Sequence, residues 1–137
     1  MKKVILLIVA ICSIATMIYF SSRNAEISSC QSQFILDIIR NFGFETNSYY
    51  IRKFAHFFIF VIIEICVSMF IGSCIESNIL TVILSFIKSS TYACIDEYIQ
   101  TFIPGRSGNI GDVIIDISGV IIGLALYIII IYLIPNN

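Results

Sequence analysis

The chain has 137 residues, of which 58% are hydrophobic and only 12% are charged, and its formal net charge is −1. Soluble domains carry about twice this charged share, so these side chains are too few to cover a folded chain with polar surface. The composition therefore predicts a membrane protein. It argues against a nucleic-acid-binding protein, which needs a concentrated basic surface. No repeat or Gly/Ser-rich linker divides the sequence, so we expect a single domain over residues 1–137.

The first apolar segment, Val4–Phe20, follows Lys2 and Lys3. At 1.5 Å per residue it reaches roughly 25 Å, which is just enough to cross a bilayer as a helix. A cleaved signal peptide starts with similar charges, but residues 21–25 offer no convincing A-x-A cleavage site. The segment is therefore predicted to be a membrane helix, with a signal peptide as the alternative.

Three more apolar segments follow, Phe54–Gly72, Ile79–Ile95 and Val113–Ile134, the last of which ends at Pro135. Only helices satisfy every backbone group internally over such lengths in lipid. We therefore expect an all-α integral membrane bundle of four transmembrane helices, with a tight turn at Ser73–Asn78.

Residues 21–51 form a long first loop that mixes polar and apolar side chains. Its apolar residues fall at helical spacing, which predicts an amphipathic helix lying on the membrane or over the bundle. These residues are Phe34, Ile35, Ile38, Ile39 and Phe42.

The orientation is judged from the basic residues. With the N-terminus inside, only Lys2 and Lys3 are cytoplasmic, and the positive-inside rule prefers the reverse arrangement. However, three of the basic residues outside, Arg52, Lys53 and Arg106, belong to a polar constellation. They can be present for the chemistry of a site rather than to set the orientation in the membrane. We therefore expect the N-terminus in the cytoplasm and the constellation on the outer side.

The polar constellation lies where the second helix begins, the third ends and the fourth begins. Ionisable residues in membrane spans are costly, so each needs a reason. Helices of alternating direction bring these three places to one side of the membrane, where a single polar pocket can collect them. The members are Arg52, Lys53, His56, Asp96, Glu97, Gln100, Arg106, Asp112 and Asp116, with Glu45 nearby.

The spacing within the constellation places its members in pairs on helical faces. Arg52 and His56, Asp96 and Gln100, and Asp112 and Asp116 are each four residues apart. Asp112 can equally be a charged cap at a helix N-terminus, whereas Asp116 lies one turn deeper and favours a role facing the bundle.

His56 can be a general base, a metal ligand or a satisfied histidine at the membrane interface. It is the only histidine, and no cysteine stands beside it, so a tight zinc site would need carboxylate ligands. We therefore assign no metal and no cofactor.

Two further features lie deeper in the spans. Glu64 and Lys88 lie at comparable depth, which allows a structural ion pair or a proton path. Gly119 and Gly123 form a Gly-x-x-x-Gly step, which favours close helix packing.

Three blocks of the sequence resemble the VanZ-like family of small bacterial membrane proteins, which is associated with resistance to teicoplanin and related glycopeptides. They are Arg52-Lys53-x-x-His56, then Asp96-Glu97-x-x-Gln100-x-Phe102-x-Pro104-Gly105-Arg106, then Asp112-x-x-x-Asp116-x-x-Gly119. The middle block is the most specific. The resemblance implies a multi-pass protein of the bacterial cytoplasmic membrane and supplies no established reaction.

The chain departs from the family's pattern in two places. The family usually has a tyrosine one turn after its histidine, often preceded by Glu, where this chain has Ile59-Phe60. The pocket thereby loses a hydroxyl and a carboxylate. Asp116 stands where the family commonly carries Asn, which adds a negative charge.

The first functional hypothesis follows from the resemblance and the outward-facing pocket. The protein would lower sensitivity to teicoplanin-type (lipo)glycopeptides by binding or modifying a membrane lipid or envelope precursor, with the antibiotic itself as a further candidate ligand. The residues expected to bind are Arg52, Lys53, Gln100, Arg106, Asp112 and Asp116.

The second hypothesis is an enzyme acting on a lipid-linked envelope substrate. His56 would be the general base, with Asp96 or Glu97 as its orienting partner or as the acid. Arg52 and Arg106 would hold a phosphate or carboxylate. Since no motif identifies a Ser or Cys nucleophile, water would attack. A third hypothesis, a proton-coupled transporter, would require an oligomer because four spans are few for one subunit.

Overall fold

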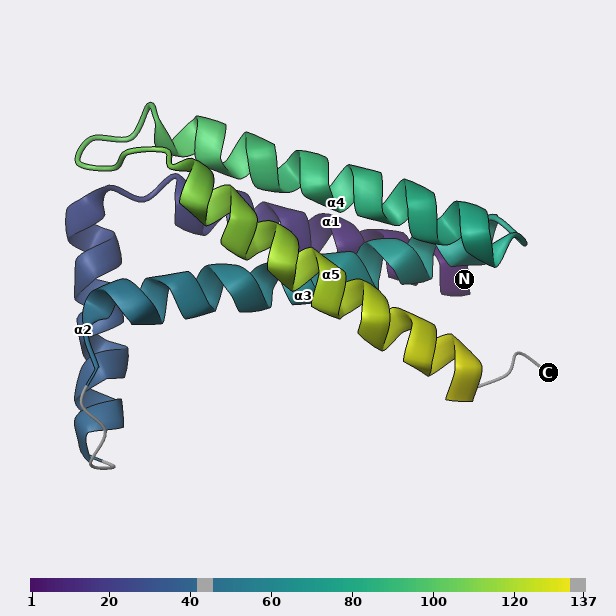
Figure 1. The fold of residues 1–137 in the computed structure, drawn as a ribbon, viewed down its shortest axis with the longest axis horizontal. Coiled ribbons are helices and arrows are strands. Elements are labelled where there is room, and N and C mark those ends of the chain that lie inside the picture. The colour runs from purple at the N-terminus through teal and green to yellow at the C-terminus, as the bar shows by residue number, and fades with distance from the viewer. Residues whose placement is uncertain (42–45, 134–137) are drawn as a thin grey trace.

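The structure is a computed structural model that describes residues 1–41 and 46–133. This part of the chain folds into five helices, shown in Figure 1: α1 (Lys2–Ser21), α2 (Ala25–Asn41), α3 (Ser48–Cys74), α4 (Asn78–Gln100) and α5 (Ile110–Leu133). Four of them, α1, α3, α4 and α5, are long and apolar enough to cross a membrane. The predicted all-α bundle of four membrane helices is therefore confirmed.

The helices are longer than the apolar segments, since they also include polar residues at their ends. Helix α3 begins at Ser48 rather than Phe54, and α4 continues to Gln100 rather than Ile95. The side chain of Asn47 caps α3 by accepting hydrogen bonds from the backbone N–H groups of Tyr49 and Tyr50. The predicted turn after α3 is shorter than expected, since only residues 75–77 separate α3 from α4. Ile134, the predicted last residue of the fourth span, and Pro135, which follows it, lie outside the described residues.

Helix α2 is the predicted amphipathic helix of the first loop. It lies crosswise at one end of the bundle, where α1 ends and α3 begins (Figure 1). Its side chains Ser28, Ser32 and Leu36 are buried, whereas Phe34 and Ile38 are exposed. An exposed apolar face at the end of a membrane bundle is typical of a helix that lies in the interface. Phe42, which the sequence pattern also assigned to this helix, lies outside the described residues.

Helix α3 is the centre of the bundle, since it packs against each of the other four helices. The buried apolar core consists of Met17, Phe60, Ile63, Val67, Ile71, Ala93 and Val120. Most of the remaining surface of the spans is also apolar: large residues such as Ile8, Ile83 and Ile129 are exposed. Such a surface is suited to lipid contact.

The Gly-x-x-x-Gly step of α5 brings this helix close to α3. A Cβ atom at Gly123 would lie only 2.6 Å from the carbonyl oxygen of Val61, and one at Gly119 would collide with the carbonyl of Phe57. Both glycines are buried. The prediction that they serve close packing is therefore confirmed.

Candidate functional site

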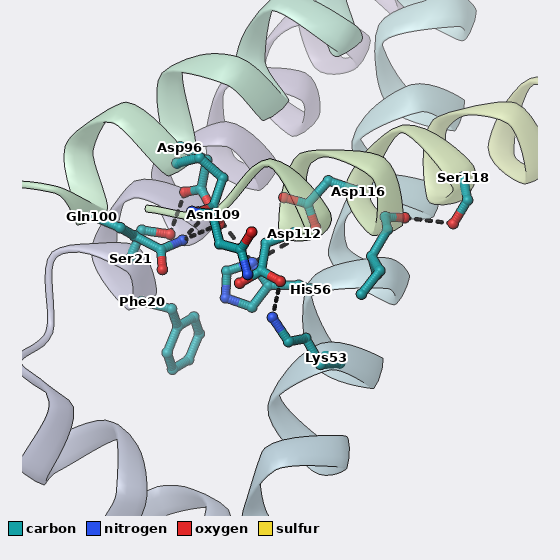
Figure 2. Close-up of polar contacts among 12 residues, drawn as sticks. Phe20, Ser21, Lys53, His56, Asp96, Gln100, Asn109, Asp112, Asp116 and Ser118 are labelled. Atoms are coloured by element: carbon teal, nitrogen blue, oxygen red, sulfur yellow. Dashed lines mark hydrogen bonds and ion pairs between the residues drawn. The ribbon is translucent and has the colours of Figure 1, made fainter. Parts of the chain in front are cut away.

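The polar constellation gathers at the end of the bundle where α2 lies. The alternating helix directions place the last residue of α1, the first turns of α3 and α5 and the last turns of α4 at this end (Figure 1). Figure 2 shows that His56 of α3 points toward Asp96 of α4 and Asp116 of α5. The polar residues of α3, α4 and α5 therefore meet at one end of the bundle, as the alternating helix directions predict.

Asp96 is fully buried, and three side chains contact its carboxylate. The hydroxyl of Ser21 donates a hydrogen bond to Oδ1, and Nε2 of Gln100 donates to Oδ2 at 3.0 Å. Nδ1 of His56 lies 3.4 Å from Oδ2. This carboxylate therefore connects α1, α3 and α4.

Glu97 is also buried and has a partner on each oxygen. Its Oε1 accepts a hydrogen bond of 2.9 Å from Nε2 of Gln100. Its Oε2 accepts one of 2.9 Å from the backbone N–H of Asn109, just before α5. Gln100 thus holds both acidic side chains in place, and Glu97 fixes the start of α5.

Asp116 differs from these two acids because neither of its oxygens has a hydrogen-bond partner, although the side chain is fully buried. In the described part of the chain its one contact within ion-pair distance is with His56, whose Nδ1 lies 3.7 Å from Oδ1. The Nδ1 atom also has no hydrogen bond. Asp116 therefore faces the interior of the bundle, as its position one turn deeper than Asp112 predicts.

Lys53 and Asp112 form an ion pair at the mouth of the site (Figure 2). Both side chains are mostly buried, with 18% and 21% of their surface exposed. Asp112 lies in the first turn of α5, but the side chain that caps this turn is that of Asn109, whose Oδ1 accepts a hydrogen bond from the backbone N–H of Gly111. Asp112 therefore acts mainly as the partner of Lys53.

Arg106 directly follows the turn formed by Pro104 and Gly105, in which Gly105 adopts a positive φ of 75°. Its guanidinium donates hydrogen bonds to the backbone carbonyl of Ser21 at 3.0 Å and to the hydroxyl of Ser28 at 3.2 Å. Burial lowers the pKa of Arg106 from its ordinary value, as does the nearby charge of Arg52, while the charges of Asp96 and Glu97 act in the opposite direction. The group remains a cation, since arginine keeps its proton in proteins.

Two cavities meet at this end of the bundle. The first, termed the polar pocket, has a volume of about 200 Å³ and is lined by Arg52, Lys53, His56, Gln100, Arg106 and Asp116, among others. The second, termed the apolar groove, has a volume of about 810 Å³ and is lined mainly by side chains of α1, α2 and α3, such as Met17, Phe34, Ile35, Phe58, Ile59 and Ile62. Arg52, His56 and Arg106 line both. The site is therefore amphipathic, with its cations at the boundary.

Three polar contacts at the site were not expected from the sequence. Ser21, Ser28 and the backbone N–H of Asn109 hold Asp96, Arg106 and Glu97. The two serines lie in stretches that hydropathy treats only as the end of a span and a loop, so no pattern singled them out. Glu45, which was expected near the site, lies outside the described residues.

Of the two roles that the sequence allowed for Glu64 and Lys88, the structure contradicts the ion pair. Glu64 is fully buried and accepts a hydrogen bond of 2.8 Å from the hydroxyl of Ser68, whereas Lys88 is exposed on the surface of α4. Among the described residues no ion pair joins them. An ammonium group on a long stem can reach the interface from the lipid side, so it needs no partner in the bundle.

Compared with known protein families, the chain matches the family described as VanZ/LLP1 over residues 5–132. The match includes every helix of the bundle and all residues of the site. No curated protein and no solved structure matches the chain.

Proposed function

The chain belongs to the VanZ/LLP1 family, and we propose that it is a protein of the bacterial cytoplasmic membrane that lowers sensitivity to teicoplanin-type glycopeptides by binding an anionic, lipid-linked component of the envelope. The observation that carries this proposal is the junction of the polar pocket and the apolar groove at Arg52, His56 and Arg106. A lipid with a charged headgroup has the same division into a polar and an apolar part.

The polar pocket suits a phosphate or carboxylate headgroup. Arg52 and Arg106 line it from α3 and from the loop before α5, and guanidinium groups bind such anions through paired N–H donors. The carbonyl and hydroxyl partners of Arg106 are neutral, so its charge is not cancelled by direct contact with a carboxylate. It therefore remains available to an incoming anion.

The apolar groove suits the hydrocarbon part of the same ligand. Phe34, Phe58 and Ile62 line it and are themselves exposed, so the groove is open to its surroundings. Since its walls belong to membrane helices and to the interfacial helix α2, those surroundings are lipid. A chain entering from the bilayer would stay in an apolar environment while its headgroup reached the cations.

The test is expression of the protein in a teicoplanin-susceptible Gram-positive host, with inhibition by teicoplanin as the measurement. We expect the protein to raise the inhibitory concentration several-fold and the Arg106→Ala variant to lose this effect at equal protein level. Arg40→Ala is the matched control, because Arg40 is an exposed arginine on α2 outside both cavities. Unchanged susceptibility on expression would refute the proposal.

The ligand class is tested on purified protein in detergent with a polyprenyl phosphate as the probe. The uncharged polyprenol is the control for binding by the apolar groove alone. We expect the phosphate to bind at least tenfold more tightly than the alcohol, and Arg106→Ala to remove the difference. Equal affinities would exclude recognition of the anion.

A second candidate function, an enzyme that acts on the bound lipid, is favoured by one observation. The Nδ1 atom of His56 lies against carboxylates while 20% of the side chain remains exposed, and the residue lines the polar pocket. This is the arrangement of a general base whose orientation is set by an acid. Incubation with labelled envelope lipids should then give turnover that His56→Ala loses, whereas binding without conversion would count against an enzyme.

A further inference from the structure

The deepest part of the site contains one nitrogen and three carboxylate ligands in close proximity. His56, Asp96, Glu97 and Asp116 each offer an atom, and these four atoms all lie within 4.8 Å of one another. The three acids are buried. We propose that these four residues bind a divalent transition-metal ion of the Mn²⁺ or Zn²⁺ type. This inference does not depend on the proposed function.

The distances agree with shared coordination. Nδ1 of His56 lies 3.4 Å from Asp96 and 3.7 Å from Asp116. Two ligands bound tetrahedrally at about 2.1 Å are held about 3.4 Å apart. The separations of His56 from Asp96 and from Asp116 are therefore close to that of two ligands that share one ion.

The ligand atoms that most need a partner point into this cluster. Both oxygens of Asp116 and Nδ1 of His56 are buried without a hydrogen bond. A buried polar atom without a partner is costly, and a fully buried carboxylate is more so. A metal ion would satisfy these three atoms at once.

The cations nearby do not neutralise the cluster by direct contact. Lys53 pairs with Asp112, and Arg106 donates its hydrogen bonds to a carbonyl and a hydroxyl. Within the described part of the chain, His56 is the only basic side chain within ion-pair distance of Asp96 or Asp116. An added charge of +2 would therefore offset most of the negative charge of three carboxylates.

The surrounding hydrogen bonds are those that a metal site requires. Ser21, Gln100 and the backbone N–H of Asn109 donate to Asp96 and Glu97 and fix their orientation. Each carboxylate oxygen has a second lone pair, so these bonds leave it able to bind a metal. Imidazole combined with carboxylates favours Mn²⁺, Fe²⁺ or Zn²⁺, whereas Mg²⁺ prefers oxygen ligands and retained waters.

The test uses the full chain, purified in detergent with a tag that contains no histidine and stripped with a chelator. Mn²⁺ and Zn²⁺ are added separately, with Mg²⁺ for comparison, and retained metal is counted after desalting. We expect close to one equivalent of Mn²⁺ or Zn²⁺ and at least tenfold weaker retention of Mg²⁺. No retention by the folded protein, or equal retention of all three ions, would overturn the proposal.

The variants Asp116→Asn and His56→Gln should each weaken retention at least tenfold. Glu64→Gln is the matched control, since Glu64 is another buried carboxylate of the bundle, two turns further along α3 than His56. Retention that is equal in all variants would overturn the assignment of ligands.

A spectroscopic measurement tests the same ligands without any variant. Because His56 is the only histidine, ¹⁴N imidazole coupling in the pulsed EPR spectrum of the Mn²⁺-loaded protein can come from this residue alone. We expect that coupling, and a bound ion without it would refute the site. Since no lipid or antibiotic is present, failure here leaves the proposed function untouched, and failure of the resistance test leaves the metal site untouched.

Discussion

Arg106 and Ser21 are joined by a hydrogen bond of 3.0 Å from the guanidinium to the backbone carbonyl, while the hydroxyl of Ser21 donates to Asp96. Ser21, at the end of α1, thus has two contacts. Its backbone carbonyl binds the loop after α4, and its side chain binds α4 itself. The same guanidinium reaches Ser28 of α2. Arg106 therefore links α1 and α2 to the loop after α4, a fastening role, and it also supplies a positive charge to the site.

Replacement of Arg106 by lysine separates these two roles. Arg106→Lys keeps a positive charge but cannot reproduce both hydrogen bonds of the planar guanidinium. We expect the free energy of unfolding in detergent to fall by about 1 kcal/mol, which is the net contribution of one such bond. Arg40→Lys is the control and should leave the midpoint of thermal unfolding unchanged. Equal midpoints for both variants would contradict the fastening role.

The ion pair between Lys53 and Asp112 is tested by a double-mutant cycle. Each side chain is mostly buried, so either single change, Lys53→Met or Asp112→Asn, leaves a charge without its partner. The double variant should be more stable than the sum of the two single effects predicts, with a coupling of about 1 kcal/mol. Chemical unfolding of all four proteins in detergent measures this coupling. Strict additivity would show that the pair contributes nothing.

Close packing of α5 on α3 predicts a strong effect of side chains at Gly123. Gly123→Val would place methyl groups against the carbonyl of Val61 and the Cβ of Glu64. We expect a loss of about 1–3 kcal/mol in unfolding free energy, as for other overpacked interiors. The control is Gly111→Ala, because a Cβ atom there meets only the side chain of Asn109 at 3.4 Å. A tolerated valine would contradict the close approach.

Orientation in the membrane is tested by cysteine labelling in intact cells. The native cysteines Cys12, Cys30, Cys66, Cys74 and Cys94 are free thiols and are first replaced by alanine. Single cysteines are then introduced at Ser107, in the exposed loop at the site, and at Glu76, in the exposed turn at the other end. With the N-terminus inside, an impermeant maleimide should label Ser107→Cys in intact cells and Glu76→Cys only after permeabilisation. The reverse pattern would place the pocket in the cytoplasm and exclude direct action on an extracellular antibiotic.

The sequence was sufficient to predict the spans and the end of the bundle at which the site forms. Long apolar runs can only be helices in lipid, and alternating helix direction then determines which ends meet. For this reason the sequence alone places His56, Asp96 and Asp116 at the same end of the bundle.

The contacts within the bundle could not be predicted in the same way. In a membrane the core and the lipid-facing surface are both apolar, so hydrophobic residues do not indicate which side of a helix is buried. Equal depth therefore suggested that Glu64 meets Lys88, although the two side chains point to different environments. The sequence also could not show that Arg106 contacts a backbone carbonyl rather than a carboxylate. Every residue has a backbone carbonyl, so the residue types do not indicate which one accepts the hydrogen bond.

The meeting of the polar pocket and the apolar groove at Arg52, His56 and Arg106 has a consequence for how the site would fill. A ligand that arrives sideways from the bilayer is confined to two dimensions, so occupancy follows its mole fraction among the lipids rather than its concentration in water. Dilution of a vesicle suspension would then leave the bound fraction unchanged, whereas dilution of the ligand with neutral phospholipid would lower it.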